Sequence, residues 1–385
     1  MPGSLEISSP SSPVRTIPTD TPAAPAPGIA LCLSGGGYRA MLFHLGALWR
    51  LNELAYLPKL LRISSVSGGS ITAGVLGYRW HSLAFVNDVA TMFQKEVVVA
   101  IRTLAGKTID VGDVLRGVFL PGNIGEKVAA SYNTLLKHAT LQDPPDTPRF
   151  VINATNVQSG ALWRFSKPYM WDWRVGKVAN PTIELAVAVG ASSAFPPVLS
   201  PARLHFQTGD FVPGSGVDLQ RPPFTEDVFL TDGGVYDNLG LETAWKLYDT
   251  ILVSDGGGKM APDPEPHTDW ARHALRINEV IDNQVRSLRK RQLIASYKSG
   301  QRKGTYWGVR SDIADYPAQH TLPCPPEDTI ALAEYPTRLA AVPETTQKRL
   351  INWGYAICDA AIRAHVSPES PAPATFPYAD VKVGR

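Results

Sequence analysis

Residues 29–40 read IALCLSGGGYRA, and this stretch decides the fold. Its first five residues are an unbroken apolar run, which is typical of a strand buried on both faces of a parallel sheet. Three glycines follow, and residues 38–54 then repeat apolar side chains at helical spacing. A buried strand that leads through a glycine turn into a helix is the basic unit of an α/β sheet.

The same pattern recurs along the chain. We expect a second short strand over residues 61–66, followed by a helix of small residues over 68–78. We also expect helices over residues 85–104, 124–136, 182–191, 239–247, 271–297 and 347–364, and strands over residues 150–155, 162–165, 228–230, 250–253 and 306–309. Alternating strands and helices predict a three-layer α/β/α sandwich with a mostly parallel central sheet.

Proline divides the chain into regions. Seven prolines fall within residues 1–27, which we expect to be a flexible Pro/Ser-rich tail. Residues 367–385 are expected to form a second, Pro-rich tail at the C-terminal end. No shift in composition interrupts residues 28–366, so we expect a single domain there.

Composition excludes several classes of protein. The 385 residues carry a formal net charge of +2, which gives no reason to bind nucleic acid. No run of 18 apolar residues is present to span a bilayer, and the N-terminal residues do not resemble a secretory signal. The three scattered cysteines form neither a disulfide framework nor a CxxC metal site. We therefore expect a cytoplasmic protein that needs no metal and no cofactor.

The first chemical feature is the glycine loop Gly35-Gly36-Gly37 at the start of the predicted helix. Backbone N–H groups at a helix start attract negative charge, so this loop is suited to hold a phosphate or an oxyanion. No Gly-Lys-Ser/Thr follows, so it is not a Walker loop. The alternative is a plain strand–helix turn.

The second feature is a serine-rich turn at residues 64–70, SSVSGGS. Ser67 lies where a short strand meets two glycines and a helix, which is the setting of a nucleophile elbow. The usual pattern is GxSxG, and here Ser65 replaces the first glycine. A serine nucleophile needs donors for the developing oxyanion, and the glycine loop after the preceding strand is placed to supply them.

Two aspartates follow later strands. Asp232 precedes Gly233 and Gly234, and it is suited either to cap a turn or to accept the proton of a serine. Asp255 precedes three more glycines and is expected to be a structural cap or the wall of a pocket.

The glycine loop, the serine turn and the Asp-Gly-Gly segment, in this order, resemble the patatin-like phospholipases. The resemblance covers about residues 29–258. It implies a lipid acyl hydrolase with a Ser–Asp dyad, in which Ser67 is the nucleophile and Asp232 the general base. It also implies an oxyanion hole at Gly35, Gly36 and Gly37, and a phospholipid or other acyl-ester lipid as substrate.

The resemblance further implies supporting roles for three residues around the dyad. Arg39 is expected either to brace the loop or to face a phosphate headgroup. Gly68 and Asp255 are expected to support the loop or the substrate.

Two alternatives remain open. A general carboxylesterase would complete a Ser-Asp-His triad with a late histidine, of which His267, His273 and His320 are the candidates. A catalytically inactive lipid-binding module would keep the loop without the chemistry. In either case, seven basic residues and no acidic residue between positions 285 and 303 lead us to expect peripheral contact with an anionic membrane.

Overall fold

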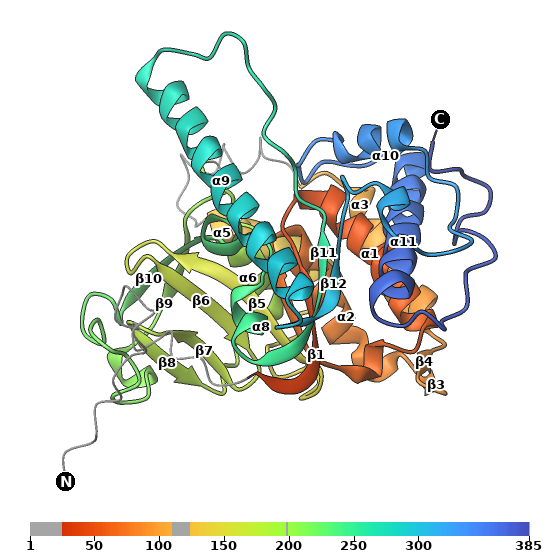
Figure 1. Ribbon diagram of the computed structural model, residues 1–385. Helices are drawn as coiled ribbons and strands as arrows, with labels where there is room; N and C mark the ends of the chain where they lie inside the picture. The colour runs from red at the N-terminus through yellow and green to blue at the C-terminus, as the bar shows by residue number, and fades with distance from the viewer. Residues whose placement is uncertain (1–24, 110–123, 198, 385) are drawn as a thin grey trace, which may run out of the picture.

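The computed structural model describes residues 25–109, 124–197 and 199–384, so most of the predicted N-terminal tail lies outside the described residues. Within these ranges a ten-stranded sheet has helices on both faces (Figure 1), which confirms the predicted α/β class. The strands, including the separate hairpin β3–β4, are β1 (Ala26–Leu33), β2 (Leu60–Val66), β3 (Phe85–Val86), β4 (Val89–Ala90), β5 (Arg149–Asn156), β6 (Ala161–Ser166), β7 (Tyr169–Asp172), β8 (Gly176–Ala179), β9 (Ala202–His205), β10 (Asp227–Asp232), β11 (Tyr248–Asp255) and β12 (Lys303–Gly308). The helices are α1 (Gly37–Glu53), α2 (Gly68–Arg79), α3 (Val99–Ala105), α5 (Ile124–Leu136), α6 (Leu185–Ser192), α7 (Gly234–Asp237), α8 (Glu242–Trp245), α9 (Trp270–Lys298), α10 (Pro326–Ala333) and α11 (Glu344–His365).

The parallel part of the sheet positions the glycine turns. Its strands lie in the order β12-β11-β1-β2-β5, and each neighbouring pair is parallel. Strands β6, β7 and β8 extend this sheet as an antiparallel meander, while β10 pairs antiparallel with β5 and β9. Because β1, β2 and β11 run in the same direction, the loops that follow them meet at one edge of the sheet.

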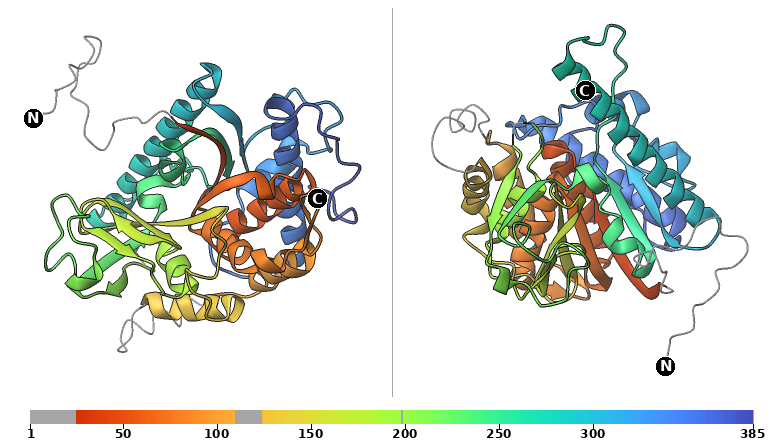
Figure 2. Two further views of the ribbon diagram at one scale, coloured as in Figure 1. Left: turned by 90° about the horizontal axis from the view of Figure 1, so that it is seen from below. Right: turned by 90° about the vertical axis from the view of Figure 1, so that its left-hand side faces the viewer.

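Burial on both faces explains the unbroken apolar run of β1. Leu31 and Leu33 belong to the larger core on the side of α1 and α11. Ala30 and Cys32 point to the opposite face, where they join a smaller core that includes Leu293 of α9. Figure 2 shows these helices on the two sides of the sheet. A strand covered on both faces has no polar alternate positions, which is why the sequence reads as a continuous hydrophobic segment.

The predicted helix over residues 85–104 is wrong in its first half. This segment begins with the hairpin β3–β4, and a helical segment starts only at Gln94. Asn87 and Asp88, the two residues of the hairpin turn, have φ of 49° and 64°, the left-handed values that a type I′ turn requires. Asparagine and aspartate adopt such values more readily than other residues with a side chain, so the turn interrupts the apolar pattern.

The C-terminal segment packs against the body although it contains neither helix nor strand. The Asn352 side chain donates hydrogen bonds to the carbonyl oxygens of Tyr378 (2.9 Å) and Val381 (2.8 Å). The ring of Tyr378 lies edge-on against Trp49, and Val383 is buried. The described part of this segment is therefore held by the body beyond residue 366, where the sequence predicted a separate tail.

Most of the basic residues between positions 285 and 303 contact the body of the protein. Arg286 and Lys290 approach Asp255, Arg289 lies 3.4 Å from Glu242, and the largely buried Arg302 donates to a backbone carbonyl oxygen. These four side chains are therefore engaged with the body, and the expected contact with an anionic membrane stays a prediction. No helix in the described ranges is long and apolar enough to cross a membrane.

Candidate active site

Ser67 lies at a sharp turn between β2 and α2 and is half-buried. Its φ of 50° and ψ of −121° are strained for a residue with a side chain, and such strain persists only where the surroundings hold it. The Ser67 N–H donates to Ser192 Oγ at 3.0 Å, and this hydrogen bond ties the turn to the end of α6. The strand-turn-helix context predicted for a nucleophile elbow is therefore present.

Glycine permits the elbow and the glycine loop to pack backbone against backbone. A Cβ on Gly68 would overlap the backbone of Gly37, and one on Gly69 would lie 2.5 Å from the carbonyl oxygen of Leu33. Ser65, which replaces the usual first glycine, is buried and accepts a hydrogen bond from Ser70 Oγ at 3.0 Å. The substitution of glycine by serine at this position is thus accommodated by a hydrogen bond.

The glycine loop has two N–H groups that are free to bind a ligand. Gly36 and Gly37 have φ of 143° and 58°, and among the described residues their N–H groups have no hydrogen-bond partner. Gly35 differs from the prediction, because its N–H donates to the carbonyl oxygen of Asn238 at 3.0 Å. Gly35 is therefore not available as an oxyanion donor, whereas the N–H of Gly68, at the first turn of α2, is also without a partner in the described residues.

Asp232, at the end of β10, is 2% exposed. Its Oδ1 accepts the Gly234 N–H at 2.7 Å, while Oδ2 is buried without a hydrogen bond of ordinary geometry among the described residues. Burial raises the pKa of this carboxyl to about 6, and its interactions with the Gly234 N–H and the Ser67 side chain offset part of that rise. Ser67 and Asp232 are thus brought together, with a carboxyl whose pKa suits proton transfer near neutrality.

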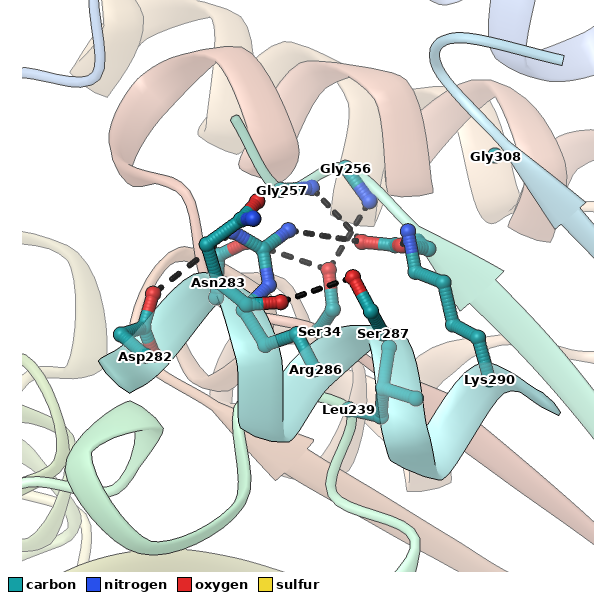
Figure 3. A network of polar contacts seen from close by, with 12 residues as sticks. Ser34, Leu239, Gly256, Gly257, Asp282, Asn283, Arg286, Ser287, Lys290 and Gly308 are labelled. Carbon is teal, nitrogen blue, oxygen red and sulfur yellow. Dashed lines mark hydrogen bonds and ion pairs between the residues drawn. The ribbon is translucent and has the colours of Figure 1, made fainter. Parts of the chain in front are cut away.

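Asp255, the last residue of β11, lies in a separate polar network. Figure 3 shows Arg286 and Lys290 of α9 in this network, beside Gly256 and Gly257. Asp255 contacts Lys290 Nζ at 2.5 Å and accepts hydrogen bonds from the Tyr306 hydroxyl (2.8 Å) and the Gly257 N–H (2.9 Å). Burial alone would raise the pKa of this carboxyl, but the cations of Lys290 and Arg286 hold it well below its ordinary value. Asp255 is therefore a permanently ionised anchor, as expected for a structural cap or pocket wall.

Arg39 braces the loop from inside. Its side chain is buried, and Nε and Nη1 donate to the carbonyl oxygens of Gly256 (3.1 Å) and Tyr335 (2.6 Å). Burial lowers the pKa of the guanidinium to about 10, so it stays charged at neutral pH. These contacts hold the loop after β11 and the segment at Tyr335, while Nη2 of Arg39 is buried without a hydrogen-bond partner among the described residues.

Asn238 is a site residue that the sequence analysis did not single out. A Cβ on Gly234 would lie 2.6 Å from its Oδ1, and one on Gly257 would lie 3.0 Å from its Nδ2. Its side chain also packs against Gly35, so it touches the glycine loop, the Asp-Gly-Gly turn and the loop after β11. In the sequence, its position six residues after Asp232 is the only sign that it lies near the site. Its contacts with the three loops are visible only in the fold.

Histidine does not join the pair of Ser67 and Asp232 in the described residues. His267 and His273 are exposed near the start of α9, where they contact each other, and His320 is exposed on the segment between β12 and α10. His44 is buried beneath the glycine loop, with its Nε2 donating to the carbonyl oxygen of Ser34 at 2.9 Å. Burial lowers the pKa of His44 to about 4, so it is neutral and structural. The described ranges also contain no group of three or more His, Cys, Asp or Glu residues suited to hold a metal ion.

Comparison with known proteins places this geometry in context. A family model described as patatin-like phospholipase matches residues 31–245, whereas no curated protein matches the chain. Among solved structures, the human GIVD cytosolic phospholipase A2 superimposes with a TM-score of 0.51 at 12% identity, over 86% of this chain and 58% of that chain. VipD from Legionella pneumophila gives a TM-score of 0.36 at 15% identity, over 89% of this chain and 68% of that one. The chain thus spans little more than half of the human enzyme, and the likeness concerns the fold.

Proposed function

This chain belongs to the patatin-like phospholipase family, and from that premise we propose that it hydrolyses fatty acyl esters of lipids through Ser67 and Asp232. One observation carries the proposal: a half-buried serine on a strained turn lies beside a buried carboxyl whose pKa is raised to about 6. The N–H groups of the adjoining glycine loop that are free to bind a ligand support the same conclusion.

In the proposed reaction, Asp232 accepts the proton of Ser67 as Oγ attacks the ester carbonyl carbon. The N–H groups of Gly36 and Gly37 donate to the oxyanion that forms, with that of Gly68 as a further donor. Asp232 then returns the proton to the departing alcohol, and an acyl-serine remains. Water attacks this ester with Asp232 again as base, which releases the fatty acid and restores the serine.

A carboxylate with an ordinary pKa near 4 is a poor base for a serine hydroxyl. Burial of Asp232 raises its pKa to about 6 and so reduces the energy needed for proton transfer. This compensates for the absence of a histidine from the pair in the described residues. The triad alternative would require one of the late histidines to reach Asp232, whereas His267 and His273 are exposed at the start of α9.

The substrate class is tested by product analysis. We expect the protein to release fatty acid from defined phospholipids and glycerides, and the Ser67→Ala variant to release none. The products, separated by mass spectrometry, distinguish a phospholipase A from a lysophospholipase or a general lipase. If the folded protein leaves every lipid and short-chain ester intact, the inactive lipid-binding module becomes the better description.

Substitution of Gly36 by alanine tests the oxyanion loop. The added Cβ would lie 2.7 Å from the carbonyl oxygen of Gly256 at a φ of 143°, so the loop must move. We expect kcat for ester hydrolysis to fall by roughly 10²–10³-fold with little change in KM, because the donors act on the transition state. The matched control is Gly209→Ala, because a Cβ at Gly209 would meet no atom within 4 Å. Equal activity of both variants would contradict a role for the loop.

We also propose that the protein contacts lipid surfaces through α9. Figure 1 shows the N-terminal half of this helix extending beyond the sheet. Trp270, Ile277, Ile281 and Leu288 are exposed, and their spacing of 7, 4 and 7 places them on one face. Trp270 is 85% exposed. Exposed apolar side chains gathered on one face of a helix are typical of an interaction surface. Because the proposed substrate is a lipid, a lipid surface is the partner that fits this face. The expected location in the cytoplasm stays a prediction.

Replacing two side chains of this face tests the lipid contact. We expect Ile277→Ser combined with Ile281→Ser to weaken binding to phospholipid vesicles by about tenfold or more, because buried apolar area drives the contact. Hydrolysis of a soluble short-chain ester should be unchanged, since neither residue touches Ser67 or Asp232. Asn278→Ser, on the same exposed stretch of helix, serves as control, and a vesicle affinity unaltered by the double substitution would refute the contact.

A further inference from the structure

A cavity of about 410 Å³ lies between α9 and the carboxyl ends of β11 and β12. Four cationic side chains line it (Lys259, Arg286, Lys290 and Arg310), against the single carboxylate of Asp255. Figure 3 shows Arg286 and Lys290 reaching from α9 toward the loop that contains Gly256 and Gly257. Neither Ser67 nor Asp232 lines this cavity, so it is separate from the proposed catalytic pair.

The cations exceed what the local carboxylates neutralise. Lys290 pairs closely with Asp255, at 2.5 Å. Arg286 lies 3.8 Å from both Asp255 and Asp282, and its Nε is buried without a hydrogen-bond partner among the described residues. Arg310 approaches Glu334 only at 4.0 Å, and no ion pair of Lys259 occurs in the described part of the chain. The cavity therefore keeps a surplus of positive charge that an anion can neutralise.

Hydrogen-bond donors accompany this charge. Ser311 Oγ accepts the N–H of Gly308 at 3.0 Å and lies 3.4 Å from the Tyr316 hydroxyl, a long contact that a closer ligand oxygen can replace. The side chain of Asn283 also lines the cavity and carries two donors. Several donors around a concentrated positive charge match a group with several oxygens and a charge near −2, which describes a phosphate monoester.

We propose that this cavity is a binding site for a phosphate monoester group. The loop after β11 contributes Gly257 and Gly258 to the lining of this site, and its preceding residue, Gly256, contacts the residues that flank the glycine loop. The Gly256 N–H donates to Ser34 Oγ at 2.8 Å, and the Gly256 carbonyl oxygen accepts from Arg39 at 3.1 Å. A phosphate group held here would rest against the loop that braces Gly36 and Gly37.

The test removes cations that do not neutralise the buried Asp255. We expect the variant Lys259→Gln/Arg310→Gln to fold normally, because both side chains reach solvent. The control, Arg291→Gln/Lys298→Gln, changes the net charge equally at exposed positions outside the cavity. Binding is measured by calorimetry with glycerol 3-phosphate, and by sedimentation with vesicles of non-hydrolysable dialkyl phosphatidylcholine containing dialkyl phosphatidic acid.

The two probes separate the sources of the phosphate group. If the cavity variant loses affinity for both probes, the phosphate suffices; if it loses affinity for the vesicles alone, the ligand is a lipid headgroup, because the proposed apolar contact of α9 is intact in both variants. In either case the cavity variant should bind at least about tenfold more weakly than the control variant. The proposal is overturned if neither probe binds, or if the cavity and control variants lose affinity equally. These assays involve no turnover, so their outcome is independent of the proposed hydrolysis.

Discussion

Replacement of Ser67 by alanine is expected to lower kcat/KM for ester hydrolysis by roughly 10⁴–10⁶-fold, to the level set by binding and the oxyanion donors alone. The reason is that Ser67 Oγ is the only atom proposed to form the acyl intermediate. Its strained φ of 50° is held by the turn and by the Ser192 contact of its N–H, neither of which needs the hydroxyl. The measurement is steady-state hydrolysis of a soluble ester, with circular dichroism to verify the fold.

The matched control is Ser70→Ala, which removes a second hydroxyl from the same turn. Ser70 Oγ donates to Ser65 and lies 2.9 Å from Ser192 Oγ, so its loss costs stability but leaves the proposed nucleophile in place. We therefore expect Ser70→Ala to retain substantial activity. If the two variants lose activity to the same extent, the effect belongs to the turn as a whole and not to Ser67.

Replacement of Asp232 by asparagine should inactivate the enzyme and stabilise it at the same time. Loss of the base is expected to lower kcat by about 10²–10⁴-fold. The folded-state pKa of about 6 exceeds the ordinary value of 3.8, so the native protein binds a proton more tightly than the unfolded chain does. Stability therefore falls as pH rises from about 4 to 6, and the ionised carboxylate costs about 3 kcal/mol above that range. Asparagine avoids this cost.

Urea unfolding at pH 8 and pH 4 measures the stability effect. Asp232→Asn should be more stable than the wild type at pH 8, with the difference vanishing near pH 4. Asp255→Asn is the matched control of opposite sign, because the cations that lower the pKa of Asp255 make its ionised form stabilising. The same reasoning predicts that wild-type kcat/KM falls tenfold per pH unit below about pH 6. A loss of stability for Asp232→Asn at pH 8 would contradict a desolvated base.

The spacing of apolar residues was sufficient to predict many of the strands and helices. The apolar run of β1 predicted a strand buried on two faces because no alternating polar residue is present, and both cores receive its side chains. The helical spacing in α5 and α9 predicted those helices to within about a residue. The hairpin at residues 85–90 could not be recognised in the same way, because the turn at Asn87 and Asp88 interrupts a segment whose apolar residues also fit a helix.

The site was predictable in its residue types but not in its contacts. Ser67 and the three glycines follow the parallel strands β2 and β1, which bring their carboxyl ends to one edge of the sheet. Asp232 ends β10, which is antiparallel to β5, so its place beside Ser67 emerged only from the fold. Sequence spacing could not show that the Gly35 N–H donates to Asn238, or that Asn238 touches three loops. Likewise, the sequence of α9 does not show which way its basic side chains point. The pairing of Arg286 and Lys290 with Asp255 therefore emerged only from the fold.

One measurement tests the proposed catalytic serine most directly. The wild-type protein is treated with a fluorophosphonate, digested, and analysed by peptide mass spectrometry. We predict a single adduct on the peptide that contains Ser67, with labelling that falls below about pH 6 as Asp232 becomes protonated. An adduct on a different serine, or none on well-folded protein, would show that Ser67 is not the nucleophile.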